Sequence, residues 1–281
     1  MNQDSSAGGR LVSIGVWSAS KLSSALSSKT LALLHLGRWG ELRRVSQTAI
    51  DLTVKNGNLP WQGIFRAVLA WLNMLAGNLE QARNLSEELL KTHSREPLGQ
   101  VGTMALITSC FVDVETGKPA RAVENLLRAR DRASQPKFFL EWYWKTVAQY
   151  GLATALLELG DLKRAGVEAN CLLESVLPSA DPALKALAWE IAARIALAAG
   201  DSERAGECSR HALAALHPVA PPHAAWRARW TCALVCRAAG DLDGAKLHHR
   251  GACAILRQLA DSFEPGDPQR ASLLAMAARE L

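Results

Sequence analysis

A glycine recurs six times along this chain, at intervals of 40, 40, 43, 40 and 40 residues. Five of the six are followed five residues later by an alanine, and only Leu42 departs from this rule. A constant period of this length is typical of proteins built from stacked repeats. The sequence therefore predicts one array of repeated units rather than one or two ordinary compact domains. The glycines are Gly37, Gly77, Gly117, Gly160, Gly200 and Gly240.

Each repeat has the sequence pattern of two helices that meet at the glycine. An apolar run ends there, because glycine readily takes the left-handed conformation that closes a helix. Asp161, Asp201 and Asp241 directly follow three of the glycines, and their side chains are expected to cap the next helix, as is that of Asn78. Helix pairs are predicted at residues 21–36 and 41–55, 61–76 and 79–93, 97–115 and 119–134, 138–159 and 162–177, 182–199 and 202–217, and 222–239 and 242–261, with a last helix at 267–281.

The pattern extends beyond the turn and resembles the tetratricopeptide repeat (TPR), although the period is longer than the usual value of about 34 residues. That family places a small residue where its two helices meet, and small residues stand here seven positions before every glycine. These are Thr30, Ala70, Cys110, Ala153, Ala193 and Ala233.

The run from Leu259 to Leu274 looks like the end of the long-period, MalT-like TPR arm of bacterial ATP-dependent transcriptional regulators and cyclase-linked signalling ATPases. This resemblance covers about residues 21–281. It implies an all-α, right-handed α-solenoid of about six TPR-like helix pairs plus a C-terminal capping helix. It also implies the role of that arm, which is to bind a partner or an effector.

The repeat boundaries divide the chain into six units and a cap. Residues 1–20 fit no helix pair and are expected to form a poorly ordered lead-in. The units are expected at about 21–57, 58–96, 97–136, 137–180, 181–220 and 221–262, with the cap at 263–281.

Composition and charge argue against several classes of partner. The net charge is only +5, and bases alternate with acids, so direct contact with nucleic acid is not expected. The most apolar window, residues 183–199, contains three charged side chains, so no membrane segment is predicted. Without a secretion signal at the start, a cytoplasmic location with reduced, buried cysteines is expected.

No catalytic motif is present, and the chain is interpreted as a non-enzymatic protein without a cofactor. Gly117-Lys118 is not part of an ATP-binding loop, because Val112 and Pro119 stand where glycine and a hydroxyl residue are needed. An all-helical hydrolase or cyclase remains a weak alternative, for which Glu158 and Glu190 are the candidate carboxylates.

One group of residues has the composition of a metal site but is interpreted as core. Its members Cys232 and Cys236 fall on apolar positions of the repeat, where free cysteine behaves as a small hydrophobe. Structural zinc usually takes its ligands from short turns rather than from two long helices. No metal is therefore expected at Cys232, Cys236, His248, His249 and Cys253.

In the resembled family the first helix of each pair lines an inner groove. This register predicts a partner-binding groove that is aromatic toward the N-terminal half and rich in arginine toward the C-terminal end. The candidate groove residues are Trp71, Met74, Phe111, Tyr150, Glu158, Glu190, Arg194, Arg227, Trp230 and Arg237. Glu115 falls on the same register.

The groove supports two main hypotheses. The first is a protein-interaction scaffold that binds a peptide, with an acidic group held by Arg194, Arg227 and Arg237. The second is a sensor arm with a closed pocket for a small regulatory ligand, to which Tyr150, Glu190, Arg194 and Trp230 would contribute.

Some candidate groove residues have a competing interpretation as core. Trp71 and Phe111 would then pack between neighbouring helices, and the arginines would pair with Glu158 or Glu190. Two further tryptophans, Trp189 and Trp142, are expected in the core, the second of them within the aromatic run of residues 138–144.

Overall fold

The computed structural model describes residues 21–93, 99–134 and 140–281, and every regular element in these ranges is an α-helix. The prediction of an all-α protein is thus confirmed for this part of the chain. The lead-in expected at residues 1–20 lies outside the described residues, and so do Pro97, Pro136, Phe138 and Phe139.

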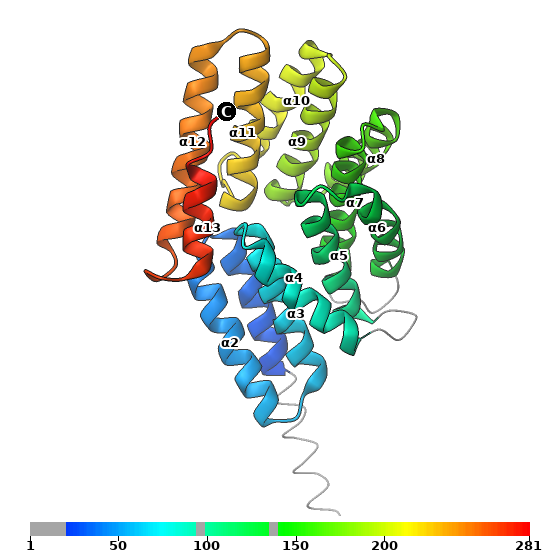
Figure 1. The fold of residues 1–281 in the computed structure, drawn as a ribbon, viewed down its shortest axis with the longest axis vertical. Helices are drawn as coiled ribbons and strands as arrows, with labels where there is room; N and C mark the ends of the chain where they lie inside the picture. Colours follow the sequence, from blue (N-terminus) through cyan, green and yellow to red (C-terminus); the bar gives the residue numbers. More distant parts are fainter. Residues whose placement is uncertain (1–20, 94–98, 135–139) are drawn as a thin grey trace, which may run out of the picture.

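The helices follow the predicted pairs closely along the sequence (Figure 1). After a first helix at residues 21–35, they are α2 (Trp39–Lys55), α3 (Leu59–Leu75), α4 (Leu79–Thr92), α5 (Gln100–Glu115), α6 (Pro119–Ala133), α7 (Glu141–Glu158), α8 (Leu162–Val176), α9 (Pro182–Ala198), α10 (Ser202–Ala215), α11 (Pro222–Ala238), α12 (Leu242–Asp261) and α13 (Pro268–Ala277). The last helix is shorter than expected.

The six repeated glycines close the first helix of each pair as predicted. All six have positive φ, between 71° and 81°. The residue after each glycine donates its backbone N–H to a carbonyl five positions earlier, as Asp161 does to Leu156 at 3.0 Å. This bond satisfies a carbonyl that the helix end would otherwise leave without a partner.

The caps predicted for the second helices are confirmed at three of four positions. The carboxylates of Asp161, Asp201 and Asp241 each accept a backbone N–H from the first turn of the next helix, at 3.2, 3.0 and 2.9 Å. The prediction for Asn78 is wrong. Its side-chain amide instead donates to Oδ1 of Asn73 at 2.9 Å, on the preceding helix.

The first helix of each pair lies inside the molecule and the second lies outside. Helices α3, α5, α7, α9 and α11 pack against one another in sequence, and α5 is buried around most of its circumference. By contrast α6 buries a single stripe, formed by Ala122, Leu126, Ala129 and Ala133, as an amphipathic surface helix does. This arrangement makes the first helices the ones that can shape an interior site.

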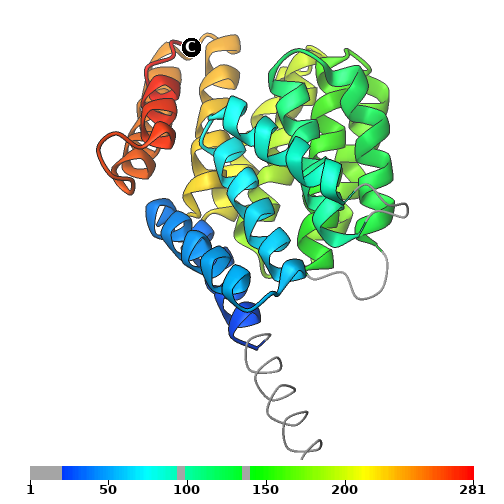
Figure 2. The ribbon, with the colours of Figure 1, turned by 60° about the horizontal axis from the view of Figure 1, so that its bottom comes forward.

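The C-terminal end of the array returns to its N-terminal end (Figures 1 and 2). The backbone N–H of Gly40 on α2 donates to Oγ of Ser262 at 3.2 Å, and Arg43 forms an ion pair with Asp267. We call these four residues the closing contact. A β-carbon on Gly40 would lie 1.9 Å from the carbonyl oxygen of Ser262, so only glycine permits this approach.

The first helix also docks onto the later pairs. Nε2 of His35 lies 3.6 Å from the carboxylate of Asp181, at the start of α9. Its ring meets the ring of His223, on α11, edge to face at a centroid distance of 5.0 Å. At this point the first helix therefore covers part of the inner face that the sequence predicted as a partner-binding groove.

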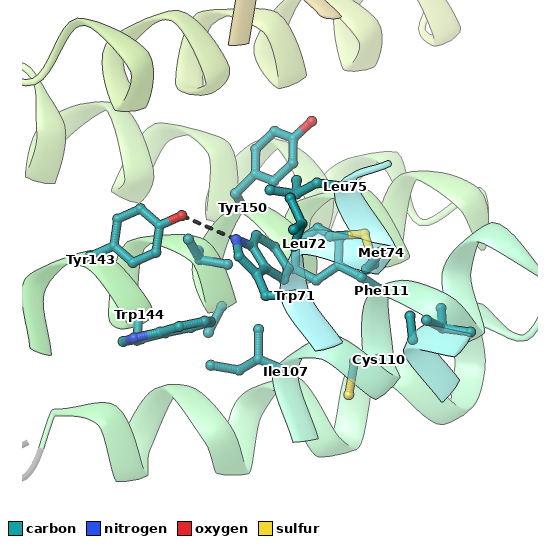
Figure 3. Packing of buried hydrophobic residues seen from close by; sticks show 14 of the residues in the cluster. Trp71, Leu72, Met74, Leu75, Ile107, Cys110, Phe111, Tyr143, Trp144 and Tyr150 are labelled. Carbon is teal, nitrogen blue, oxygen red and sulfur yellow. Dashed lines mark hydrogen bonds between the residues drawn. The ribbon is translucent and has the colours of Figure 1, made fainter. Parts of the chain in front are cut away.

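Part of this interior is an aromatic cluster around Trp71 (Figure 3). The Trp71 ring lies 5.2 Å from Phe111 and 5.7 Å from Trp144, and its N–H donates to the hydroxyl oxygen of Tyr143 at 3.3 Å. The expectation that Trp142 is core is wrong, because this side chain is 49% exposed. Its neighbours Tyr143 and Trp144 are the buried members of that run.

Two smaller expectations about core residues also need correction. Trp189 is only partly buried, and its ring stacks on His211 at a centroid distance of 4.6 Å. Among the cysteines, Cys171 is exposed and Cys236 is half-buried, while the other four are buried.

Candidate functional site

A partly enclosed cavity of about 230 Å³ lies where the inner helices of the last pairs meet the C-terminal segment. It is much larger than two apolar voids of about 40 and 30 Å³ beside the aromatic cluster. Its walls come from α5, α9, α11 and α12, and from α13 and the residues just after it. The lining residues are Glu115, Glu190, Arg194, Trp226, Arg227, Trp230, Thr231, Leu234, Leu256, Met276 and Arg279.

The most buried charge in this lining is Glu190, which is 3% exposed. Its Oε2 accepts a hydrogen bond from the hydroxyl of Tyr150 at 2.9 Å, and its Oε1 accepts one from Thr231 at 2.7 Å. Nε of Arg194, one turn along α9, lies 3.9 Å from Oε1. A buried carboxylate is stable only with such partners, so Glu190 is held in place rather than free to react.

Arg194 is neutralised within the protein. Its Nη2 donates to Oε1 of Glu158 at 2.8 Å, in addition to the contact with Glu190. Burial opposes the charged form, but the neighbouring Glu190 and the other acids raise the pKa of Arg194 above its usual value. This arginine therefore remains charged and is already paired on two sides.

The hydroxyl of Tyr150 is a donor at any ordinary pH. Burial, together with the adjacent Glu190, raises the pKa of Tyr150 well above its usual value. The residue lies behind the cavity wall and supports Glu190 from the neighbouring helix α7.

Two other arginines of the lining, Arg227 and Arg279, form no ion pair with a carboxylate in the part of the chain that the structure describes. Among the described residues, no carboxylate oxygen lies within 4.0 Å of the guanidinium of Arg227 or Arg279. The Arg227 guanidinium carbon lies 4.5 Å from the ring centroid of Trp226, within cation–π range. The lining contains three arginines and two glutamates, and Glu158 outside it pairs with Arg194, so the formal charges balance and the positive charge is concentrated at Arg227 and Arg279.

The structure brings some of the predicted groove residues together and separates others. Glu190, Arg194, Arg227 and Trp230 line the cavity, and Tyr150 and Glu158 hold its wall by hydrogen bonds. The remaining four lie elsewhere: Trp71, Met74 and Phe111 are buried in and beside the aromatic cluster, and Arg237 is exposed outside the lining.

The prediction that three arginines together bind an acidic group of a partner therefore needs correction. Arg194 pairs with Glu158 and Glu190, as the competing interpretation held, and Arg237 does not reach the cavity. The two carboxylates weighed for catalysis bind the same guanidinium, so their contacts are those of a structural ion pair. Arg227 remains, and Arg279 joins it.

Several lining residues escaped the sequence analysis. Trp226 and Thr231 stand directly beside register positions that were predicted, so a register widened by one residue would include them. Arg279 and Met276 come from the C-terminal segment, which lies outside the repeat register. Only the return of that segment to the interior reveals them.

Comparisons with known proteins add no family to this description. No family model matches the sequence, and no curated protein matches it either. Of the helices in the described part of the chain, none has both the length and the apolar character that a membrane span requires.

Proposed function

We propose that this chain is a non-enzymatic binding module built from TPR-like helix pairs and similar to the MalT-like arm. In this proposal it is the effector-binding arm of a bacterial signalling or transcription regulator. Its support is the recurrence of one turn geometry at all six glycines, together with burial of every small residue seven positions before them.

The effector in this proposal is a small organic anion that binds in the 230 Å³ cavity described above, which we call the central cavity. The observation that carries it is Arg227, a half-buried cation without a carboxylate partner among the described residues, placed beside two tryptophans. Guanidinium groups bind carboxylates and phosphates through paired hydrogen bonds, and indole rings cover the apolar part of such ligands. Most small-ligand sites combine a concave wall with a few convergent polar groups in this way.

A thermal-shift screen followed by calorimetry tests the proposal. The probes are inorganic phosphate, aliphatic dicarboxylates, aromatic carboxylates and nucleoside phosphates. A ligand at a hundred times its Kd stabilises a folded protein by about 2.7 kcal/mol, which is readily seen as a rise in Tm. We expect at least one class of anion to raise the Tm of the wild-type protein.

Two substitutions on the same helix separate cavity binding from general charge effects. Arg227→Gln removes the cavity cation, whereas Arg237→Gln removes an exposed one outside the lining. The shift should persist in Arg237→Gln and disappear in Arg227→Gln. A screen in which no anion acts, or a shift that survives Arg227→Gln, would exclude the cavity as an anion site.

A second candidate function, a scaffold for a protein partner, is favoured by Trp142. This indole is 49% exposed on α7, and tryptophan is among the residues that most often anchor protein interfaces. Under this alternative, Trp142→Ala would lower affinity for a purified partner while Arg227→Gln would not. The reverse result would favour the anion site.

A further inference from the structure

Three residues with metal-binding side chains converge at the last helix pair. Cys232 and Cys236 lie one turn apart on α11, and His248 faces them from α12. One ligand atom from each residue can be chosen so that all three lie within 4.8 Å of one another. Cys232 is buried, while Cys236 and His248 are half-buried, so a cation could enter from the surface.

The structure divides the five residues that the sequence grouped together. Cys253 lies against His249, with Sγ 3.5 Å from Nε2. His249 also contacts the Trp230 ring, and its Nε2 lies 3.0 Å from the backbone carbonyl oxygen of Arg279. These two residues therefore belong to the surroundings of the central cavity, and only the other three form a compact group.

His248 provides a second observation that points to a ligand. Its Nδ1 is buried and has no hydrogen-bond partner within the described residues. A buried nitrogen without a partner destabilises the folded state unless something binds it. Packing alone explains the two thiols as small apolar groups, but it leaves this imidazole nitrogen unsatisfied.

We propose that Cys232, Cys236 and His248 bind one zinc ion, with water in the fourth position. Zinc favours a tetrahedron of sulfur and nitrogen ligands, with bonds of about 2.0–2.3 Å. Those bond lengths place ligand atoms about 3.5–3.8 Å apart, so only small side-chain rotations are needed. Two thiolates balance the charge of the cation, and binding releases the two thiol protons to solvent.

Such an ion would join α11 to α12 directly. Cys232 is the neighbour of Thr231, whose hydroxyl binds Glu190 in the cavity wall. The metal would therefore fix the helix that carries Arg227 and Trp230. The proposal does not rest on the anion site, because none of the three ligands lines that cavity.

Cobalt is a suitable probe, because Co²⁺ takes the same ligands and is coloured. Titration of the fully reduced protein without oxygen should produce the thiolate-to-cobalt charge-transfer band of a tetrahedral site. The band should saturate at one equivalent, and Zn²⁺ should abolish it. Zn²⁺ alone should also raise the Tm of the wild-type protein.

Matched variants test the assignment of the ligands. Cys236→Ser should abolish the charge-transfer band or weaken binding at least about tenfold, and His248→Gln should do the same. Cys208→Ser and Cys171→Ser remove a buried and an exposed thiol elsewhere, and both should bind cobalt as the wild type does.

The far-ultraviolet circular dichroism of each variant shows whether it is folded. If Cys236→Ser does not fold, a folded His248→Gln variant decides the matter. The absence of a band that saturates at one equivalent would overturn the proposal. A band of unchanged strength in either folded ligand variant would overturn it as well.

Discussion

The hydroxyl of Tyr150 donates to the buried carboxylate of Glu190 at 2.9 Å, from the inner helix of the preceding pair. The same carboxylate accepts a hydrogen bond from Thr231 on the following inner helix. One charged group thus links α7, α9 and α11 at the point where they form the cavity wall. The wall should be rigid, because each member of this network has a partner.

Two buried tyrosines provide a matched measurement of this link. Tyr150→Phe removes a hydrogen bond to a charged acceptor and should lower the free energy of unfolding by about 1.5–3 kcal/mol. Tyr143→Phe removes only the neutral bond with Trp71 and should cost about 0.5–1.5 kcal/mol. Urea unfolding of both variants checks the difference, and equal losses would show that the charge of Glu190 adds nothing to the strength of its hydrogen bond with Tyr150.

Neighbouring tryptophans on α7 should differ sharply in their contribution to stability. Trp144 is 3% exposed, and Trp144→Ala should cost about 3–5 kcal/mol because it leaves a cavity. Trp142→Ala should cost about half of that or less, since half of this side chain is already in water. Denaturant midpoints of the two variants give the comparison, and the opposite order would contradict the placement of α7.

Closure of the array can be tested at one glycine. Gly40→Ala places a methyl group against the backbone of Ser262 and should destabilise the protein by about 1–3 kcal/mol. Gly206→Ala is the control, because its added carbon meets only the end of the Arg210 side chain at 3.6 Å. That change on α10 should stabilise the helix by about 0.5–1 kcal/mol.

Thermal unfolding and limited proteolysis distinguish the two glycine variants. In Gly40→Ala the segment around Ser262 should become more sensitive to protease, as its contact with α2 weakens. If both alanine variants behave alike, the closing contact does not exist in solution.

The histidine pair between the first helix and α11 predicts an acid-dependent loss of stability. Burial lowers the pKa of His223 from the usual 6.5 to about 3. Between these values the unfolded chain binds a proton that the folded chain does not. As the pH is lowered through this window, the free energy of unfolding should therefore decrease, by up to about 1.4 kcal/mol per pH unit.

His35 acts in the opposite direction. Burial is the largest single influence and opposes its charge, but the hydrogen bonds with Asp181 and with the backbone carbonyl of Leu31, together with the negative charge of Asp181, outweigh burial and raise the pKa of His35. Its stabilising effect is present below the unfolded value of 6.5 and is lost as the pH rises through the folded one.

Substitution of His223 separates the two effects. His223→Phe should flatten the slope in the upper part of this window, above the pH range in which carboxylates such as Asp181 titrate, because phenylalanine cannot be protonated. His211→Phe changes an exposed histidine and should keep the wild-type slope. Urea unfolding measured across the pH window provides the test, and an unchanged slope in His223→Phe would contradict it.

The sequence predicted those features that depend on local conformation. The glycine turns and the caps at Asp161, Asp201 and Asp241 need only neighbours in the chain, and all are present. Asn78 fails because its partner Asn73 also receives a hydrogen bond from Gln269, far along the sequence. The contact between Gln269 and Asn73 joins residues that are far apart in the sequence, so no local sequence pattern predicts it.

The candidate site was predictable in part for the same reason. The repeat register placed Glu190, Arg194, Arg227 and Trp230 on one wall, since it describes which side of each inner helix faces inward. It could not supply Arg279, because the position of the C-terminal segment depends on the rotation accumulated over all the pairs. To predict that the interior is closed, one must know the total rotation over all the helix pairs, and the sequence of a single unit does not give it.

A series of helix pairs whose first and last members are in contact cannot gain or lose a pair freely. Open repeat proteins gain or lose whole units in evolution, because each unit touches only its neighbours. Here a duplication or deletion of about 40 residues would carry Ser262 away from Gly40 and leave Arg43 without Asp267. The number of units is thereby constrained, and homologous proteins with this closure should keep the same copy number.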